Sequence, residues 1–74
     1  MIVTVRCLAT LAGLAPPDGR LDVPTGTTVG DVADALGVAP EAVGSLLVNG
    51  APAERTTPLA PGDAVSIVPP ISGG

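Results

Sequence analysis

Apolar and polar side chains alternate along the first eight residues of the chain. Val3, Val5 and Cys7 fall on one side of an extended backbone, and Thr4 and Arg6 fall on the other. This period of two, rich in β-branched residues, predicts a half-buried strand. A shorter alternation over residues 20–23 predicts a second strand, and the Pro- and Gly-containing segment before it predicts the turn of a hairpin.

Residues 28–37 carry the pattern of one amphipathic helix. Thr28 is a suitable N-cap, and Asp31 stands in the first turn, where the helix dipole favours an acid. Gly37 supplies the left-handed residue that ends the helix. The spacing i, i+3, i+4 and i+7 gives this helix one apolar face, formed by Val29, Val32, Ala33 and Leu36.

The second half of the chain predicts three short strands. Residues 38–45 have a weak pattern, with at most one helical turn beginning at Pro40. Residues 46–48 are apolar, and the Asn49-Gly50 pair that follows is a strong hairpin signal, so residues 51–53 should pair back. After the turn-rich residues 56–63, residues 64–68 form the last strand, with Val65 and Ile67 facing inward.

Five short strands and one main helix predict an α+β domain. The first and last strands are both apolar, so we expect them to pair in the centre of a mixed sheet, parallel to each other, with the helix region as the crossover. This arrangement is the β-grasp fold, and it occupies residues 1–68. Residues 69–74 form an extended C-terminal tail, because Pro69 and Pro70 end the strand pairing.

Composition limits the chemistry of the chain more than its fold. Its 74 residues allow one domain, and with no Phe, Tyr or Trp the core must be aliphatic. The chain has no His, no Lys and one Cys, which excludes zinc and iron–sulfur sites, Ser/His/Asp and Cys/His triads, and a P-loop. We therefore expect no metal site and no self-contained catalysis.

Charge and cysteine use narrow the expected partners and location. A net charge of −4 disfavours nucleic acids and anionic membranes and favours a basic protein partner. Cys7 lies on the Val3 and Val5 face, so we interpret it as a small buried hydrophobe. It cannot form an internal disulfide, and the chain starts without a charged and apolar leader, which predicts a cytoplasmic protein.

Two features are candidates for function. Pro69 and Pro70 favour an extended backbone, and Gly73 and Gly74 lack Cβ atoms, so a carboxylate at Gly74 could enter a narrow cleft of another protein. On the sheet, Leu47 and Val68 point away from their inward neighbours. They are predicted to form an exposed apolar patch that binds a partner.

The ordered set of motifs resembles the ThiS/MoaD group of ubiquitin-like sulfur carriers over nearly the whole chain. Residues 5–11 resemble the first strand of the family, although Leu8 stands where a Phe is common. Val48-Asn49-Gly50, Leu59 and Gly62-Asp63 resemble the approach to the last strand. Residues 68–74, in which paired prolines precede a terminal diglycine, are similar to the tail of MoaD, the small sulfur-carrier subunit of molybdopterin synthase.

This resemblance implies a carrier and co-substrate that is not itself an enzyme. The Gly74 carboxylate would be adenylated by an E1-like adenylyltransferase that uses ATP, and a sulfur donor would then convert it to a thiocarboxylate. The tail that presents it would be Pro69, Pro70, Ile71, Ser72 and Gly73. No cofactor would be bound. The proline pair points to molybdenum cofactor biosynthesis, with the molybdopterin synthase large subunit as the acceptor enzyme.

Three alternatives stay open at this point. The sulfur could serve thiamine or cysteine biosynthesis, or the activated Gly74 could form isopeptide bonds with lysines of other proteins, as a ubiquitin-like modifier does. Residues 21–37 also resemble the small β-grasp domain of some tRNA synthetases, which suggests RNA binding. The net charge of −4 and the lack of aromatic residues weigh against RNA.

Overall fold

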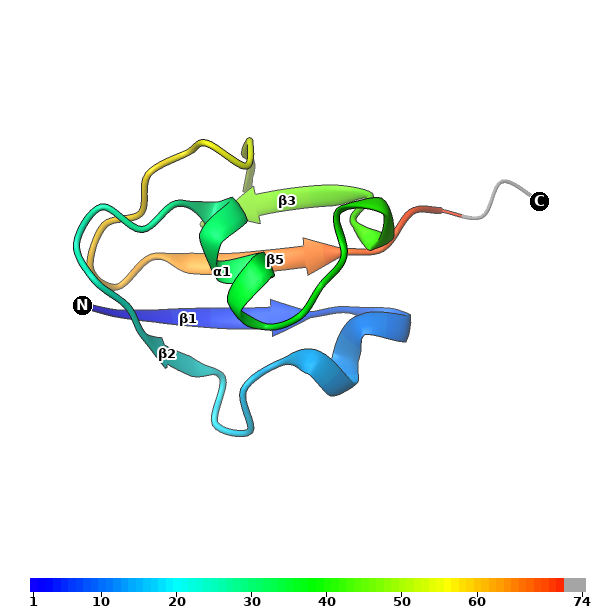
Figure 1. The fold of residues 1–74 in the computed structure, drawn as a ribbon, viewed down its shortest axis with the longest axis horizontal. Helices are drawn as coiled ribbons and strands as arrows, with labels where there is room; N and C mark the ends of the chain where they lie inside the picture. Colours follow the sequence, from blue (N-terminus) through cyan, green and yellow to red (C-terminus); the bar gives the residue numbers. More distant parts are fainter. Residues whose placement is uncertain (72–74) are drawn as a thin grey trace.

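A mixed five-stranded sheet with one α-helix across one face organises the computed structural model, which describes residues 1–71 (Figure 1). The strand order is β2-β1-β5-β3-β4. The central strands β1 and β5 run parallel, and the other neighbours run antiparallel. The strands are β1 (Ile2–Cys7), β2 (Arg20–Asp22), β3 (Ser45–Val48), β4 (Ala51–Pro52) and β5 (Ala64–Val68). The helices are α1 (Val29–Ala35) and the 3₁₀ helices η1 (Ala9–Leu14) and η2 (Pro40–Ala42). The predicted β-grasp fold is confirmed.

The core lies between the sheet and α1. The inward residues of β1 and β5 meet the apolar face of the helix, and no polar or charged side chain within residues 1–71 is buried. The fully buried large side chains are Val3, Val29, Val32, Val65 and Ile67. Burial of apolar surface is the main source of stability, so this face of the sheet holds the domain together.

Helix α1 begins at the predicted N-cap Thr28, and Asp31, expected only as a first-turn acid, completes a capping box. The backbone N–H of Asp31 donates to Thr28 Oγ1 over 3.2 Å, and the backbone N–H of Thr28 donates to the Asp31 carboxylate over 3.0 Å. These two bonds satisfy donors that a helix start leaves unpaired. The helix stops before Gly37, whose φ of 79° is the left-handed conformation expected there.

The connection between β1 and β2 contains a helix that the sequence pattern did not predict. Only a turn was expected over residues 9–19, but residues 9–14 form the 3₁₀ helix η1, with Leu11 buried against the core. The chain enters η1 through Ala9 at a φ of 49°. Short 3₁₀ helices lack a strong apolar period. The prediction for this connection therefore depended on the Pro and Gly residues near its end, which indicate a turn.

The turn between β3 and β4 is fixed by side chains as well as by backbone conformation. Asn49 and Gly50 have φ values of 53° and 84°, as the hairpin signal requires. The Asn49 side chain also donates to Asp63 over 3.1 Å and accepts from the backbone N–H of Ala64 over 2.9 Å. The turn is therefore tied to the start of β5.

Candidate functional site

The candidate tail leaves the domain directly from the end of β5 (Figure 1). The last ladder bond beside it runs from the backbone N–H of Gly44 to the carbonyl oxygen of Val68, over 2.7 Å. Pro69 and Pro70 follow without strand pairing, as predicted, and Ile71 is 93% exposed. The predicted tail residues Ser72, Gly73 and Gly74 lie outside the described residues.

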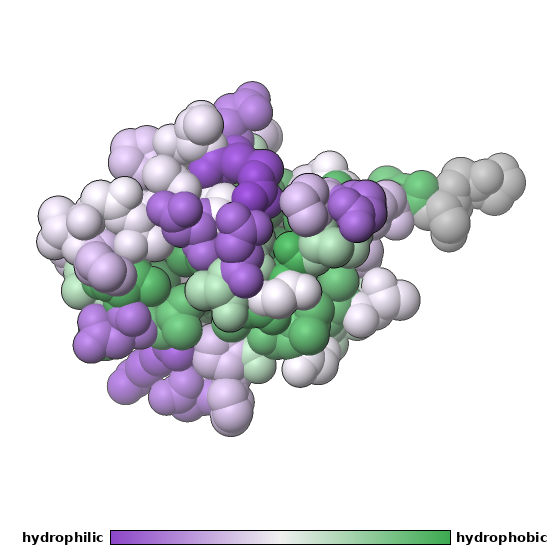
Figure 2. All heavy atoms as spheres, in the orientation of Figure 1, coloured by the Kyte–Doolittle hydropathy of each residue, from purple (hydrophilic) through white to green (hydrophobic). Residues whose placement is uncertain are grey.

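A mostly apolar groove lies along one flank of the tail base. It has a volume of about 460 Å³ and is lined by residues 8–10, at the junction of β1 and η1, and by residues 68–71. Hydrophobic surface is also visible in Figure 2 where the chain leaves the body of the domain. The groove and the candidate tail therefore form one continuous surface.

The predicted partner-binding residues lie on the open face of the sheet, opposite α1. Leu47 pairs with Ser66 and Val68 pairs with Ser45 in the β3–β5 ladder, whereas Leu46 pairs with the fully buried Ile67. Alternation along the strands therefore directs Leu47 and Val68 away from the core. Both side chains are half-buried, less accessible than the exposed patch that the sequence suggested.

Positive charge lies on the same open face. Arg6 pairs with Ser66 of β5, and Arg20 pairs with Thr4 of β1, so both arginines alternate away from the core. Among residues 1–71, neither forms an ion pair. Arg55 lies on the helix side instead, where it binds the Asp34 carboxylate over 2.9 Å.

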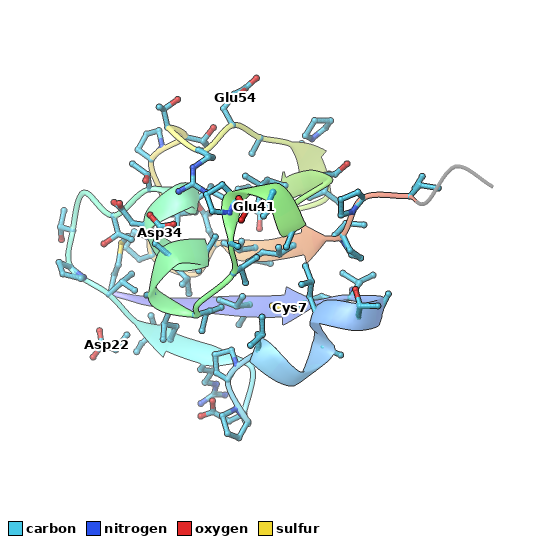
Figure 3. All side chains as sticks on the ribbon, turned by 45° about the vertical axis from the view of Figure 1, so that its right-hand side comes forward. Cys7, Asp22, Asp34, Glu41 and Glu54 are labelled. Carbon is cyan, nitrogen blue, oxygen red and sulfur yellow. The ribbon has the colours of Figure 1, made fainter. Side chains whose placement is uncertain are left out.

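Acidic side chains lie on both sides of the domain, because Asp22 pairs with Ile2 and shares the open face with Arg20. Figure 3 shows Asp34 on α1, Glu41 on η2 and Glu54 after β4, and Figure 2 shows hydrophilic surface gathered over this side of the molecule. No group of three or more potential metal ligands occurs within the part of the chain that the structure describes. Arg6 and Arg20 are thus on the open face together with Asp22, whereas Asp34 and Glu41 lie on the helix side.

Cys7 belongs to the core and not to the candidate site. Its side chain is 8% exposed and lies between β1 and η1 (Figure 3). Burial raises the pKa of the Cys7 thiol above its ordinary value. Because the thiolate is the reactive form of cysteine, the interpretation of Cys7 as a packing residue is confirmed. Within residues 1–71, no helix has the length and apolar character needed to cross a membrane.

The family of the chain follows from its full-length agreement with a known sequence model. The model of the ThiS family matches residues 5–74. The chain therefore belongs to the ThiS family, and its fold is that of the ubiquitin-like sulfur carriers and modifiers. Among curated proteins, none matches the sequence significantly.

Solved structures from two organisms share the fold. SAMP1 from Haloferax volcanii is 33% identical, with a TM-score of 0.75 and coverage of 100% of both chains. A second structure, of H. volcanii small archaeal modifier protein 1, is 28% identical, with a TM-score of 0.73 and coverage of 95% of this chain and 98% of that one. A chain from the complex of subunits 1 and 2 of the Helicobacter pylori molybdopterin-converting factor has a TM-score of 0.61 at 21% identity over 100% of both chains, a likeness of fold alone.

Proposed function

We propose that this chain is a sulfur carrier whose Gly74 carboxylate is adenylated by an E1-like enzyme with ATP and then converted to a thiocarboxylate. The observation that carries the proposal is the geometry of the tail base. Val68 is the last residue of β5, Gly44 bonds to it, and Ile71 already stands in solvent, 93% exposed. A carboxylate presented beyond this base can enter the active site of another protein while the domain stays folded.

The proposed chemistry needs the partner enzymes for its reactive steps. A carboxylate is a weak electrophile, so the activating enzyme joins Gly74 to AMP and releases pyrophosphate. A donor that delivers sulfur as hydrosulfide then provides the nucleophile: HS⁻ attacks the acyl carbon, AMP leaves with the bonding electron pair, and the thiocarboxylic acid loses its proton. The product is a thiocarboxylate, whose soft sulfur is a good nucleophile. Tethering it to a tail raises its effective concentration in the acceptor site.

We assign the sulfur to molybdopterin synthesis, with this chain as the small subunit of the synthase. The support is the pair of prolines before the diglycine, which resembles the MoaD tail. The large subunit of the synthase would receive the open face of the sheet. Leu47 and Val68 would supply the apolar contacts, and Arg6 beside them favours an acidic residue on the partner.

A second candidate function is protein modification. SAMP1 of Haloferax volcanii is similar to this chain over 100% of both sequences at 33% identity, and the second H. volcanii structure is described as small archaeal modifier protein 1. In this case a lysine amine of a target protein would displace AMP from the same adenylate and form an isopeptide bond to Gly74.

Reconstitution tests the adenylation step that both functions share. The wild-type chain, a variant without Gly74, and Glu41→Gln as a charge-altered control are each mixed with an E1-like enzyme and ATP. Pyrophosphate exchange is expected for wild type and control and is expected to be lost in the truncated chain. Exchange at the wild-type rate without Gly74 would contradict the proposal.

The acceptor decides between the two functions. Thiocarboxylated wild type is offered to a molybdopterin synthase large subunit with its pterin precursor, and in parallel the adenylate is offered to lysine-bearing proteins. Molybdopterin formation supports the carrier assignment. Conjugates without molybdopterin would support the modifier instead.

A further inference from the structure

Gly44 is a glycine whose backbone conformation does not explain its presence. It lies between η2 and β3, immediately before Ser45. Gly19, Gly26, Gly37, Gly50 and Gly62 all have positive φ, but Gly44 does not. A positive φ is therefore not the reason for glycine at this position.

The reason for glycine at position 44 is the close approach of the tail. A Cβ atom added there would lie 2.6 Å from the carbonyl oxygen of Pro69 and 2.6 Å from both the nitrogen and the Cα of Pro70. Carbon atoms pack at about 3.5–4.0 Å from non-bonded neighbours. All three contacts are backbone atoms, so none can rotate away. A side chain at position 44 would have to move the Pro69–Pro70 segment by about 1 Å.

On the β3 side, the tail base (residues 68–70) is in close contact with Gly44, and on the β1 side the backbone N–H of Leu8 donates to the carbonyl oxygen of Ile67 over 3.0 Å. The backbone N–H of Gly44 donates to the Val68 carbonyl over 2.7 Å, next to the Ser45–Val68 pair that ends the β3–β5 ladder. On the other flank lies the open groove of about 460 Å³, lined in part by residues 8–10. Steric pressure from position 44 would therefore push the tail toward the groove.

We infer that Gly44 is a positioning residue, which sets the direction in which the tail leaves the domain and thereby aligns the Gly74 carboxylate with the catalytic site of the activating enzyme. This inference rests on the proposed function. Three residues lie between Pro70 and Gly74, so the direction of the chain at Pro70 is the starting direction of the segment that carries the reacting group. A misplacement of about 1 Å can slow an enzymatic step about 100-fold.

The test compares two glycine-to-alanine variants. Gly44→Ala places a methyl group against the tail. Gly13→Ala is the matched control, because a Cβ there meets nothing within 4 Å and the residue has no positive φ. With an E1-like enzyme and ATP, Gly44→Ala is expected to lower kcat of adenylation at least about 10-fold while KM changes less than about 3-fold, because the docking face is intact. Gly13→Ala should match wild type. An unchanged kcat in Gly44→Ala would overturn the inference.

NMR of the free proteins separates this inference from the proposed function. In wild type, a short-range contact between the Gly44 and Pro70 α-protons is expected. In Gly44→Ala, this contact should be lost, with chemical-shift changes centred on residues 8–10 and 68–71. Identical tail shifts in both proteins would overturn the positioning role. If these changes occur but wild type is never adenylated, the proposed function fails and the structural role of Gly44 remains.

A second variant covers the case in which Gly44→Ala does not fold. Replacing Pro69 and Pro70 together by alanine removes the ring constraint on the tail backbone and adds no heavy atom near Gly44. The same selective loss of kcat is expected, and full kcat in this double variant would contradict the need for a fixed direction.

Discussion

The two faces of the sheet use the same strands for different purposes. Within β5, Val65 and Ile67 are 0% exposed beneath α1, while Val68 is half-buried on the open face. Within β1, Val3 is 0% exposed and Ile2 is 47% exposed. The difference shows that the helix-covered face carries the stability of the domain. The open face keeps apolar and basic side chains that the fold does not require.

The largest expected loss of stability comes from removing a core side chain on the helix-covered face of the sheet. Ile67→Ala should lower the free energy of unfolding by about 3 kcal/mol, because it removes a fully buried side chain and leaves a cavity. Small domains have a low free energy of unfolding. This variant should therefore be partly unfolded at about 37 °C. Urea unfolding followed by circular dichroism measures the change.

Val68→Ala, one residue along the same strand, is the matched control. Its side chain is half-buried on the open face, so the loss should be below about 1 kcal/mol. Equal losses for the two variants would contradict the division between the faces.

A charge on the open face should affect binding and leave the fold intact. Leu47→Asp and Val68→Asp are each expected to weaken binding to the E1-like enzyme or the synthase large subunit at least about 10-fold, because they place a carboxylate in an apolar contact. Isothermal titration calorimetry measures the affinity, and circular dichroism checks the fold. Unfolding of either variant would mean that the side chain points into the core.

A smaller effect is expected from the attachment of α1 to the covered face. Thr28→Ala removes the hydroxyl of the capping box and should destabilise the domain by about 1 kcal/mol. Partner binding should not change, because Thr28 caps α1, which lies on the opposite face of the sheet from Leu47 and Val68. Thermal unfolding and the same titration measure the two quantities. A loss of binding at unchanged stability would mean that the helix side also contacts the partner.

Cysteine labelling compares the accessibility of the two faces of the sheet, and its effect on stability is the smallest expected here. Cys7 on the covered face should react with iodoacetamide only after unfolding, whereas the Cys introduced by Ser66→Cys, on the open face, should react in the native state.

The raised pKa of the Cys7 thiol also predicts a pH-dependent stability. Because burial raises this pKa, the Cys7 thiol of the unfolded chain loses its proton before that of the folded chain as the pH rises past 9.0. The stability that the neutral thiol contributes below this pH is therefore lost above it. Wild type should lose more thermal stability in alkali than Cys7→Ala. Equal losses would contradict the raised pKa.

Local signals were sufficient to predict most of the fold. The strand alternation at Val3 and Val5, the N-cap Thr28, and the Asn49-Gly50 turn each depend on neighbours close in sequence, and each prediction is confirmed. The parallel pairing of β1 with β5 followed from the apolar character of both strands. These features agree with one another, as expected for a sequence that specifies one fold.

The unpredicted features depend on contacts between distant segments. Gly44 has no local signal, because its neighbours Pro69 and Pro70 lie 25 and more residues along the chain. The half-burial of Leu47 and Val68 depends on which strands flank β3 and β5, which alternation alone does not determine. The functional roles of Leu47, Val68 and residues 69–74 stay predictions.

The central claim is that the Gly74 carboxylate becomes a thiocarboxylate, and the intact mass of the protein tests it most directly. The chain is isolated from cells with an active sulfur donor and compared with a variant that lacks Gly74. The account predicts a species of wild type heavier by the difference between one sulfur and one oxygen atom, located at Gly74 by fragmentation and absent from the truncated variant. A wild-type protein that carries only the unmodified carboxylate under these conditions would contradict the account.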